Sequence, residues 1–260
     1  MSRQGPLRGW RVLVPRGGPW GHNVAADLRL RGASPVVAPM INFAPSSDSD
    51  ALDAALASLR DGAFDWMSVT SATTVDVLSS HQAEVPESTR IAAVGETTAA
   101  ALLAAGYRVD FVPSGDNSAA GLLREWSDVN ESVEPQRILA LRSDIAKPVL
   151  TDGLRARGHL VESVVAYRTV GVAADEQVVR SVSDGGFDAI LVTSGSVATQ
   201  LRAQFGDIPD RTLVACIGPR TAADATAAGL RVDLVARERS AESLIESLTE
   251  VAAQRAGEGK

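Results

Sequence analysis

The segment RIAAVGETTAAALLAAGYRVDFV (90–112) is repeated 123 positions later as LVACIGPRTAADATAAGLRVDLV (213–235), with 12 of 23 residues identical. The shorter segment FDWMSVTS (64–71) returns at the same distance as FDAILVTS (187–194). Self-similarity over long segments is the mark of an internal duplication. Because there are two copies, each much longer than a solenoid unit, we expect two related domains rather than an array.

The first part of each copy is also repeated. RVLVPRGGPWGHNVAADLRLRG (11–32) matches RILALRSDIAKPVLTDGLRARG (137–158) at 7 of 22 positions, and SAAGLLREW (118–126) returns as SAESLIESL (240–248). The two halves of the chain therefore carry the same run of segments in the same order.

Within each copy, short β-branched runs alternate with alanine-rich stretches. The expected strands are residues 12–14, 69–70, 91–94 and 109–112. Residues 96–105 and 220–228 are expected to be helical, because alanine is the best helix former. The glycines that follow such stretches suit C-caps with positive φ, namely Gly32, Gly106, Gly158 and Gly229. This alternation predicts an α/β protein with doubly wound parallel sheets.

The division into domains has two interpretations. The polar stretch SDVNESVEPQ (127–136) is the obvious boundary. However, ASPVVAPMINFAP (33–45) and LVESVVAYRTV (160–170) occupy equivalent places in the two halves and are long and rich in strand-forming residues. They are either ordinary second strands or extended crossovers between domains.

Composition limits the functional classes. The 260 residues are 45% hydrophobic and 22% charged, which is typical of a globular chain. A net charge of −7 argues against a nucleic-acid partner. One cysteine and three histidines exclude a disulfide framework and argue against a structural zinc site. No apolar run reaches the roughly 18 residues that a membrane span needs. With no signal-peptide core at its start, we expect a cytoplasmic protein, and by default a monomer.

The turns after the strands are the most informative segments for function. In an open α/β sheet, ligands bind beyond the carboxyl ends of the strands, where helix N-termini present free N–H groups. The turns in question are residues 15–18, 141–144, 70–73, 193–196, 95–98 and 218–221. Each serine or threonine there is, taken alone, best interpreted as a helix N-cap. Six such turns in two copies favour a surface that binds anionic oxygens.

Nucleotide binding is a weaker interpretation. Gly17, Gly18 and Gly21 follow a strand but lack the spacing of a dinucleotide loop, and no acid ends the next strand. No phosphate-binding loop is present either. A nucleotide-using enzyme is therefore disfavoured.

Several reactive side chains have structural interpretations. Cys216 lies inside a strand and is expected in the core. Asp65 and Asp188 begin strands, away from the binding edge, and are expected to be structural. His81 and His159 lie in polar loops and are expected at the surface.

A set of motifs in a fixed order covers nearly the whole chain. They are VLVPR (12–16), TS (70–71), AAVGETTAAAL (92–102), SAAGLL (118–123), ARGHLVESVVAYRT (156–169), TSGS (193–196) and IGPRTAADATAAGL (217–230). Together they resemble the uroporphyrinogen-III synthase family. The family's fold is two flavodoxin-like domains joined by a two-stranded β-ladder. The resemblance implies domain A at 1–38 and 172–260, domain B at 43–168, and linker strands at about 36–44 and 163–171, so that 127–136 becomes a loop within domain B.

The resemblance also implies a reaction. The family's enzymes, which are lyases of porphyrin and heme biosynthesis, close linear hydroxymethylbilane into uroporphyrinogen III with inversion of ring D. Loss of water gives an azafulvene, and attack by ring D gives a spiro-pyrrolenine that reopens and recloses. The implied reaction uses no cofactor and no metal, and the upstream deaminase is a candidate partner. The alternative is a non-catalytic two-domain paralogue that binds anions or tetrapyrroles as a sensor.

The family's motifs assign roles to particular residues. Tyr167 matches the tyrosine of the AYRT motif and is the candidate catalytic residue, donating a hydrogen bond to the departing hydroxyl. The residues expected to hold substrate carboxylates are Thr98, Thr221, Ser71, Ser194 and Ser196. By their charge alone, the candidate cations are Arg16, Arg142 and Lys147. Two positions depart from the family's pattern: Thr73 stands where some members carry a basic residue, and Gly195 replaces the commoner proline.

Overall fold

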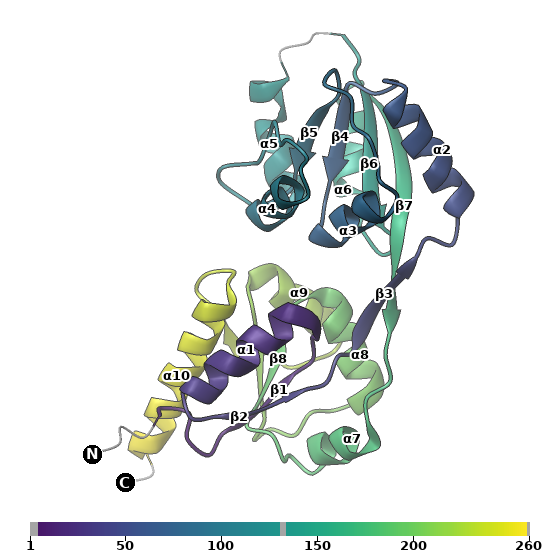
Figure 1. Ribbon diagram of the computed structural model, residues 1–260. Helices are drawn as coiled ribbons and strands as arrows, with labels where there is room; N and C mark the ends of the chain where they lie inside the picture. The colour runs from purple at the N-terminus through teal and green to yellow at the C-terminus, as the bar shows by residue number, and fades with distance from the viewer. Residues whose placement is uncertain (1–4, 131–133, 259–260) are drawn as a thin grey trace. The chain divides into compact units, whose positions relative to one another are not determined.

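The computed structural model describes residues 5–130 and 134–258 (Figure 1). The chain divides into two compact units, unit 1 (Met1–Asn42 and Val170–Lys260) and unit 2 (Phe43–Thr169). The ends of the expected domain A, residues 1–4 and 259–260, lie outside the described residues, as do residues 131–133 of the polar stretch. Each unit is described by itself below.

Unit 1 is a five-stranded sheet with helices on both faces (Figure 1). Its strands are β1 (Arg11–Val14), β2 (Ser34–Val37), β8 (Ala189–Val192), β9 (Leu213–Cys216) and β10 (Leu234–Val235). They lie in the order β10-β9-β8-β1-β2, and every neighbouring pair is parallel. Val12 and Val14 pack with α1 (Gly18–Leu30) and α10 (Ala241–Glu258). Leu13 points to the other face, towards α7 (Glu176–Ser183), α8 (Gly195–Phe205) and α9 (Pro219–Ala227).

Unit 2 repeats this arrangement. Its strands are β3 (Ile41–Pro45), β4 (Trp66–Val69), β5 (Arg90–Ala93), β6 (Arg137–Ser143) and β7 (Leu160–Gly171), in the order β3-β7-β6-β4-β5. One face carries α2 (Ser49–Arg60), α3 (Ala72–Ser80) and α4 (Glu96–Ala104). The other carries α5 (Ala119–Val129) and α6 (Val149–Arg155). The predicted α/β class, with doubly wound, mainly parallel sheets, is confirmed.

Each sheet is assembled from both copies of the repeat. Unit 1 combines β1 and β2 of the first copy with β8, β9 and β10 of the second, whereas unit 2 combines β4 and β5 with β6 and β7. A carboxylate fastens each combination: Asp188 accepts a hydrogen bond from the Arg11 N–H, and Asp65 accepts one from the Arg137 N–H, both at 2.7 Å. The structural role predicted for these two acids is confirmed.

Residues 33–45 and 160–170 contain ordinary strands of the two sheets, and the chain also crosses between the units within them. Residues 33–45 contain β2, which pairs in parallel with β1, and then β3, which pairs with β7. β7 pairs in parallel with β6 from Leu160 to Tyr167 and also contacts β3, where the Arg168 Nε donates to the Pro45 carbonyl at 3.1 Å. The chain passes from one unit to the other within these two strands (Figure 1). They form the β-ladder that joins the units.

The strand expected at 109–112 is reduced to a single bridge between Phe111 and Ala92. The Asp110 carboxylate accepts the Ile91 N–H at 2.7 Å, so a side chain occupies a place that a backbone carbonyl takes in a regular ladder. The helices expected at 96–105 and 220–228 are confirmed, as are the positive φ angles of the C-cap glycines: 92° at Gly32, 86° at Gly106, 88° at Gly158 and 84° at Gly229.

His159 is buried, so its predicted surface position is wrong. It is 8% exposed because Trp126 of α5 covers it, with the indole Nε1 donating to the imidazole Nε2 at 2.9 Å. Burial, together with the nearby charge of Arg157, lowers the pKa of His159. The ring is therefore a neutral acceptor within the core of unit 2. His81 is exposed, as expected.

Candidate functional site

Tyr167 reaches the carboxyl edge of the unit 2 sheet through an irregularity in β7. The register with β6 shifts between Arg142, which pairs with Val165, and Ser143, which pairs with Tyr167. In a regular strand, successive side chains point to opposite faces, but Ala166 and Tyr167 both pack in the same core cluster. A β-bulge re-aims a side chain in this way, and such bulges are common beside active sites.

The Tyr167 hydroxyl is held by Ser71. The two oxygens are 2.9 Å apart, and either can be the donor. Phe43 of β3 packs edge-on against the Tyr167 ring, with 5.3 Å between the ring centroids. The ring is buried, so its position is fixed from the side by Phe43 and at its tip by Ser71.

Ser71 is also the N-cap of α3, as the cap interpretation predicts. Its hydroxyl accepts the Thr74 N–H at 3.2 Å and lies 3.1 Å from the Thr74 hydroxyl. A group that caps a helix is rigid, and the tyrosine that bonds to it is positioned by that rigidity.

Thr98 and Thr221 are not N-caps. They occupy the third positions of α4 and α9, whose N-cap residues are Gly95 and Gly218, and neither helix has a side-chain cap. Both threonines are buried, at 6% exposure. The cap interpretation fails for these two residues, which leaves the first N–H groups of both helices without a side-chain acceptor from the cap residue.

Ser194 and Ser196 lie at the start of α8 in unit 1. Ser194 caps the helix by accepting the Val197 N–H at 3.3 Å, and its hydroxyl lies 3.0 Å from that of Ser196. Between them, Gly195 has a structural reason: a β-carbon there would lie 3.0 Å from Cβ and Oδ2 of Asp224. Asp224 in turn pairs with the Arg220 Nε at 3.4 Å. The departure from the family's proline thus accommodates an acid–base pair at this turn.

The three candidate cations differ in their surroundings. Arg16 is exposed and lies over the Trp20 ring, 5.0 Å from its centroid. The Arg142 guanidinium bonds within unit 2, donating to the Ser163 hydroxyl and to the Ser143 carbonyl, both at 2.9 Å. Lys147 is exposed on the segment between β6 and α6. Arg142 is therefore held by two oxygens of its own unit.

Other reactive groups are structural. Burial raises the pKa of the Cys216 thiol to about 11, as suits the core residue expected there. Among the described residues, no three His, Cys, Asp or Glu side chains come together as a metal site would require. In the same part of the chain, no helix is long and apolar enough to span a membrane.

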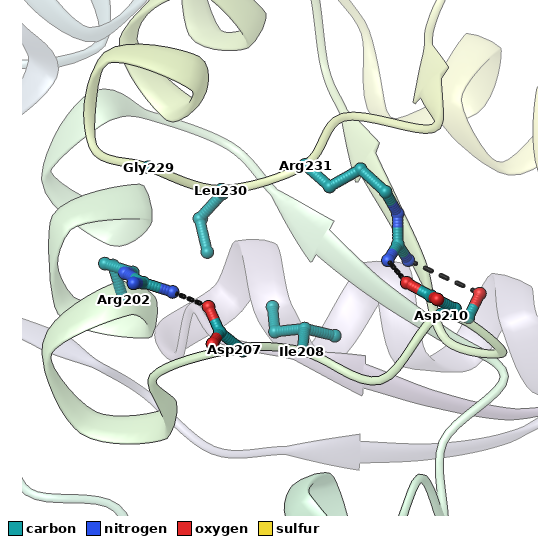
Figure 2. Close-up of a pocket in the computed structure, with 7 residues that line it drawn as sticks. All are labelled: Arg202, Asp207, Ile208, Asp210, Gly229, Leu230 and Arg231. Carbon is teal, nitrogen blue, oxygen red and sulfur yellow. Dashed lines mark hydrogen bonds and ion pairs between the residues drawn. The ribbon is translucent and has the colours of Figure 1, made fainter.

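A cavity of about 270 Å³ lies in unit 1, lined by Arg202 of α8, by Asp207, Ile208 and Asp210, and by residues 229–231, which follow α9 (Figure 2). Figure 2 shows Arg202 directed at Asp207 and Arg231 directed at Asp210, whose carboxylate is 2.6 Å from the Arg231 Nη1. These residues precede β9 and β10, so they lie at the amino edge of the sheet. The cavity is separate from the predicted residues, and its arginines are neutralised by its own acids.

The fold and the edge residues define an α/β protein of two doubly wound units, in which hydroxyl groups and cations collect at the carboxyl ends of the strands. The family model described as uroporphyrinogen-III synthase HemD matches residues 22–246, and the chain belongs to this family.

Two curated relatives agree with this assignment. The chain is 29% identical over 257 residues to the porphyrin biosynthesis protein HemD of Ruminiclostridium josui, covering 95% of this chain and 49% of that protein. It is 27% identical over 265 residues to the uroporphyrinogen-III synthase of Synechococcus elongatus, covering 96% and 98%. The chain therefore spans about half of the first relative and nearly all of the second.

Solved structures share the fold. A mutant uroporphyrinogen III synthase from Thermus thermophilus matches with a TM-score of 0.65 at 19% identity, over 95% of this chain and all of that one. The uroporphyrinogen-III synthetase of Helicobacter pylori matches with a TM-score of 0.64 at 15% identity, over 93% and 99%. At such identities the likeness concerns the fold alone.

Proposed function

We propose that this chain is a uroporphyrinogen-III synthase, which converts hydroxymethylbilane to uroporphyrinogen III with inversion of ring D. The observation that carries the proposal is the hydroxyl pair of Tyr167 and Ser71, built by a β-bulge and a helix cap at the carboxyl edge of unit 2. The family match supports the same reaction.

Tyr167 is proposed to assist the first step. The hydroxymethyl oxygen receives a proton and leaves as water, the electrons of the pyrrole nitrogen form the new double bond, and loss of the N–H proton gives the neutral azafulvene. A phenol hydroxyl held by Ser71 can donate a hydrogen bond to that oxygen. Ring D then attacks through its substituted carbon to give the spiro-pyrrolenine, which reopens and recloses with the ring inverted.

Substrate carboxylates are proposed to bind at the turns that follow the strands. Thr98, Thr221 and the serines of the α3 and α8 turns offer hydroxyl donors, while α4 and α9 offer N–H groups that no side chain caps. Because the substrate cyclises unaided to the uninverted isomer, the enzyme's main task is positioning, and several fixed anchor points serve that task.

Finer properties belong to the same proposal. We propose that the protein works in the cytoplasm as a monomer and receives its substrate from the upstream deaminase. We also propose that the family's domain A (residues 1–38 and 172–260) and domain B (residues 43–168), with linker strands at about 36–44 and 163–171, describe its functional division.

The test is a coupled assay. A deaminase supplies hydroxymethylbilane, the products are oxidised, and the porphyrin isomers are separated by chromatography. The expected product is type III. Type I alone, from protein shown to be folded by circular dichroism, would contradict the proposal and favour the non-catalytic binding paralogue.

A further inference from the structure

The two sheets present edges of different charge. At the carboxyl-edge turns of unit 1 (residues 15–18, 193–196, 217–221 and 236–240) there are four arginines and one glutamate. The repeat-equivalent turns of unit 2 (residues 141–144, 70–73, 94–98 and 113–118) carry one arginine, two aspartates and one glutamate, and Lys147 follows on the segment between β6 and α6. A chain with a net charge of −7 has therefore concentrated cations at one of two related edges.

We propose that the unit 1 edge is the main binding surface for the carboxylates of the tetrapyrrole, with Arg16, Arg220 and Arg239 as its cations. Arg220 lies inside the IGPRTAADATAAGL motif without being one of its candidate residues, and Arg239 lies outside the motifs. The identity of the ligand rests on the proposed function, whereas the preference for a polycarboxylate follows from the edge itself.

The three arginines follow three different strands of the same sheet. Arg16 comes after β1, Arg220 lies in the first turn of α9, and Arg239 precedes α10 with its Cγ 3.6 Å from the position of a β-carbon on Gly218. All three are exposed. Arg237, the fourth arginine, pairs with Glu250 of α10 at 2.7 Å, more closely than Arg220 pairs with Asp224 at 3.4 Å, and is left out of the surface.

Three helices that begin at this edge lack acids in their first turns, whereas α10 has Glu242 there. None of α1, α8 and α9 has an acidic residue in its first turn, and α1 and α9 have no side-chain cap. Arg220 lies in the first turn of α9, beside the positive end of the helix dipole, and pairs with Asp224 at 3.4 Å, so a bound carboxylate would add a second anion to that pair. The equivalent helix of unit 2, α4, carries Glu96 in its first turn.

A buried hydroxyl supports the same assignment. Thr193, at the end of β8, is 9% exposed, and its Oγ1 has no hydrogen-bond partner among the described residues. Its counterpart in unit 2, Thr70, donates to the Leu141 carbonyl at 3.5 Å. In unit 1 the corresponding carbonyl, of Pro15, accepts the Met40 N–H instead. Buried polar groups are rarely left unpaired, so an unpaired hydroxyl at this edge points to a ligand.

The test uses uroporphyrin III, the oxidised product, which keeps all eight carboxylates and is fluorescent. Its anisotropy is titrated with the full chain and with the triple variant R16Q/R220Q/R239Q. Exposed ion pairs are individually weak, so we expect about threefold loss of affinity per arginine and about 30-fold for the triple variant. The dependence of Kd on salt should flatten in parallel.

A matched control variant distinguishes an effect of the three edge arginines from an effect of the net charge of unit 1. R8Q/R29Q/R180Q changes the charge of unit 1 equally, and its three residues are exposed and lie away from the carboxyl edge. The control should bind within about twofold of the unmodified chain. Equal weakening by both triple variants, or by neither, would overturn the proposal. Thr193→Val should bind about threefold less tightly with no loss of Tm; unchanged affinity would remove Thr193 from the surface.

Isomer analysis distinguishes this inference from the proposed function. If the unmodified chain yields type III product, the arginine variant should raise KM with little change in kcat. Type III product with the KM and Kd of the variant unchanged would overturn the inference alone. Type I product only, with uroporphyrin binding still dependent on the three arginines, would overturn the proposed function and leave the binding surface standing.

Discussion

Unit 1 and unit 2 are built from the same segments in the same spatial order, yet their carboxyl edges are different surfaces. Unit 1 places arginines there, whereas unit 2 places a tyrosine held by a bulge, together with acids. At the amino edges the two units have stayed alike: Asp188 and Asp65 each accept a hydrogen bond from a backbone N–H at 2.7 Å. Duplication thus kept the framework, and the turns changed.

The largest effect on activity should come from Tyr167, which has no equivalent in unit 1. Tyr167→Phe removes the hydroxyl that Ser71 holds, and we expect kcat to fall about 100-fold, at the lower end of general-acid effects. The matched control is Tyr107→Phe, which removes the only other tyrosine hydroxyl, a donor to the Ala83 carbonyl at 3.0 Å. Kinetics of type III formation should distinguish the two. Equal kcat values would take Tyr167 out of the reaction.

The next effect is on stability, and it concerns the carboxylate hydrogen bonds that the two units share. Asp65→Ala and Asp188→Ala each delete a 2.7 Å bond from a carboxylate to a backbone N–H. We expect each to lower the free energy of unfolding by about 1–2 kcal/mol, measured by urea denaturation. Asp27→Ala, on the exposed side of α1, is the control. A large loss of unfolding free energy from one variant and none from the other would show that the two frameworks are stabilised differently.

A smaller effect tests a local divergence. Gly195→Ala places a β-carbon 3.0 Å from Asp224, and we expect a loss of about 1–2 kcal/mol in stability from this overpacking. Asp224→Ala removes the contact with Oδ2 but keeps the contact with Cβ, so it should recover part of the loss; unit 2 has two alanines, Ala72 and Ala101, at the equivalent positions. Thermal unfolding of the single and double variants measures the coupling. Additive losses would show that Asp224 is not the reason for the glycine.

The smallest effect is a pH dependence confined to unit 2. The pKa of His159 is lowered in the folded protein, so the unfolded chain binds the proton first as the pH falls. Stability from this site is therefore complete above about pH 6.5 and is lost progressively below it. His159→Gln should show a flatter dependence in urea titrations between about pH 7 and pH 5. An unchanged slope would assign the acid sensitivity to other groups.

The sequence alone predicted the fold class, the helices and the role of Ser71 as a cap, because these follow from local periodicity and capping chemistry. It did not predict the bulge that turns Tyr167, since a shift of register depends on the pairing with β6. Burial of His159 was missed because it depends on Trp126, 33 positions away. The sequence contains the arginines as charged residues, but only the strand order shows that Arg220 and Arg239 lie at the same edge of one sheet.

The interleaving of the two copies has a consequence for synthesis on the ribosome. Unit 2 is continuous (Phe43–Thr169) and can close its sheet as it emerges, but β1 must wait for β8. Between Val14 and Ala189 the ribosome adds 175 residues, which takes about 10–35 s at about 5–20 residues per second. During that interval the apolar strand Val12–Val14 has no partner on one side. The first strand to be made therefore completes its pairing only when the last third of the chain has been made.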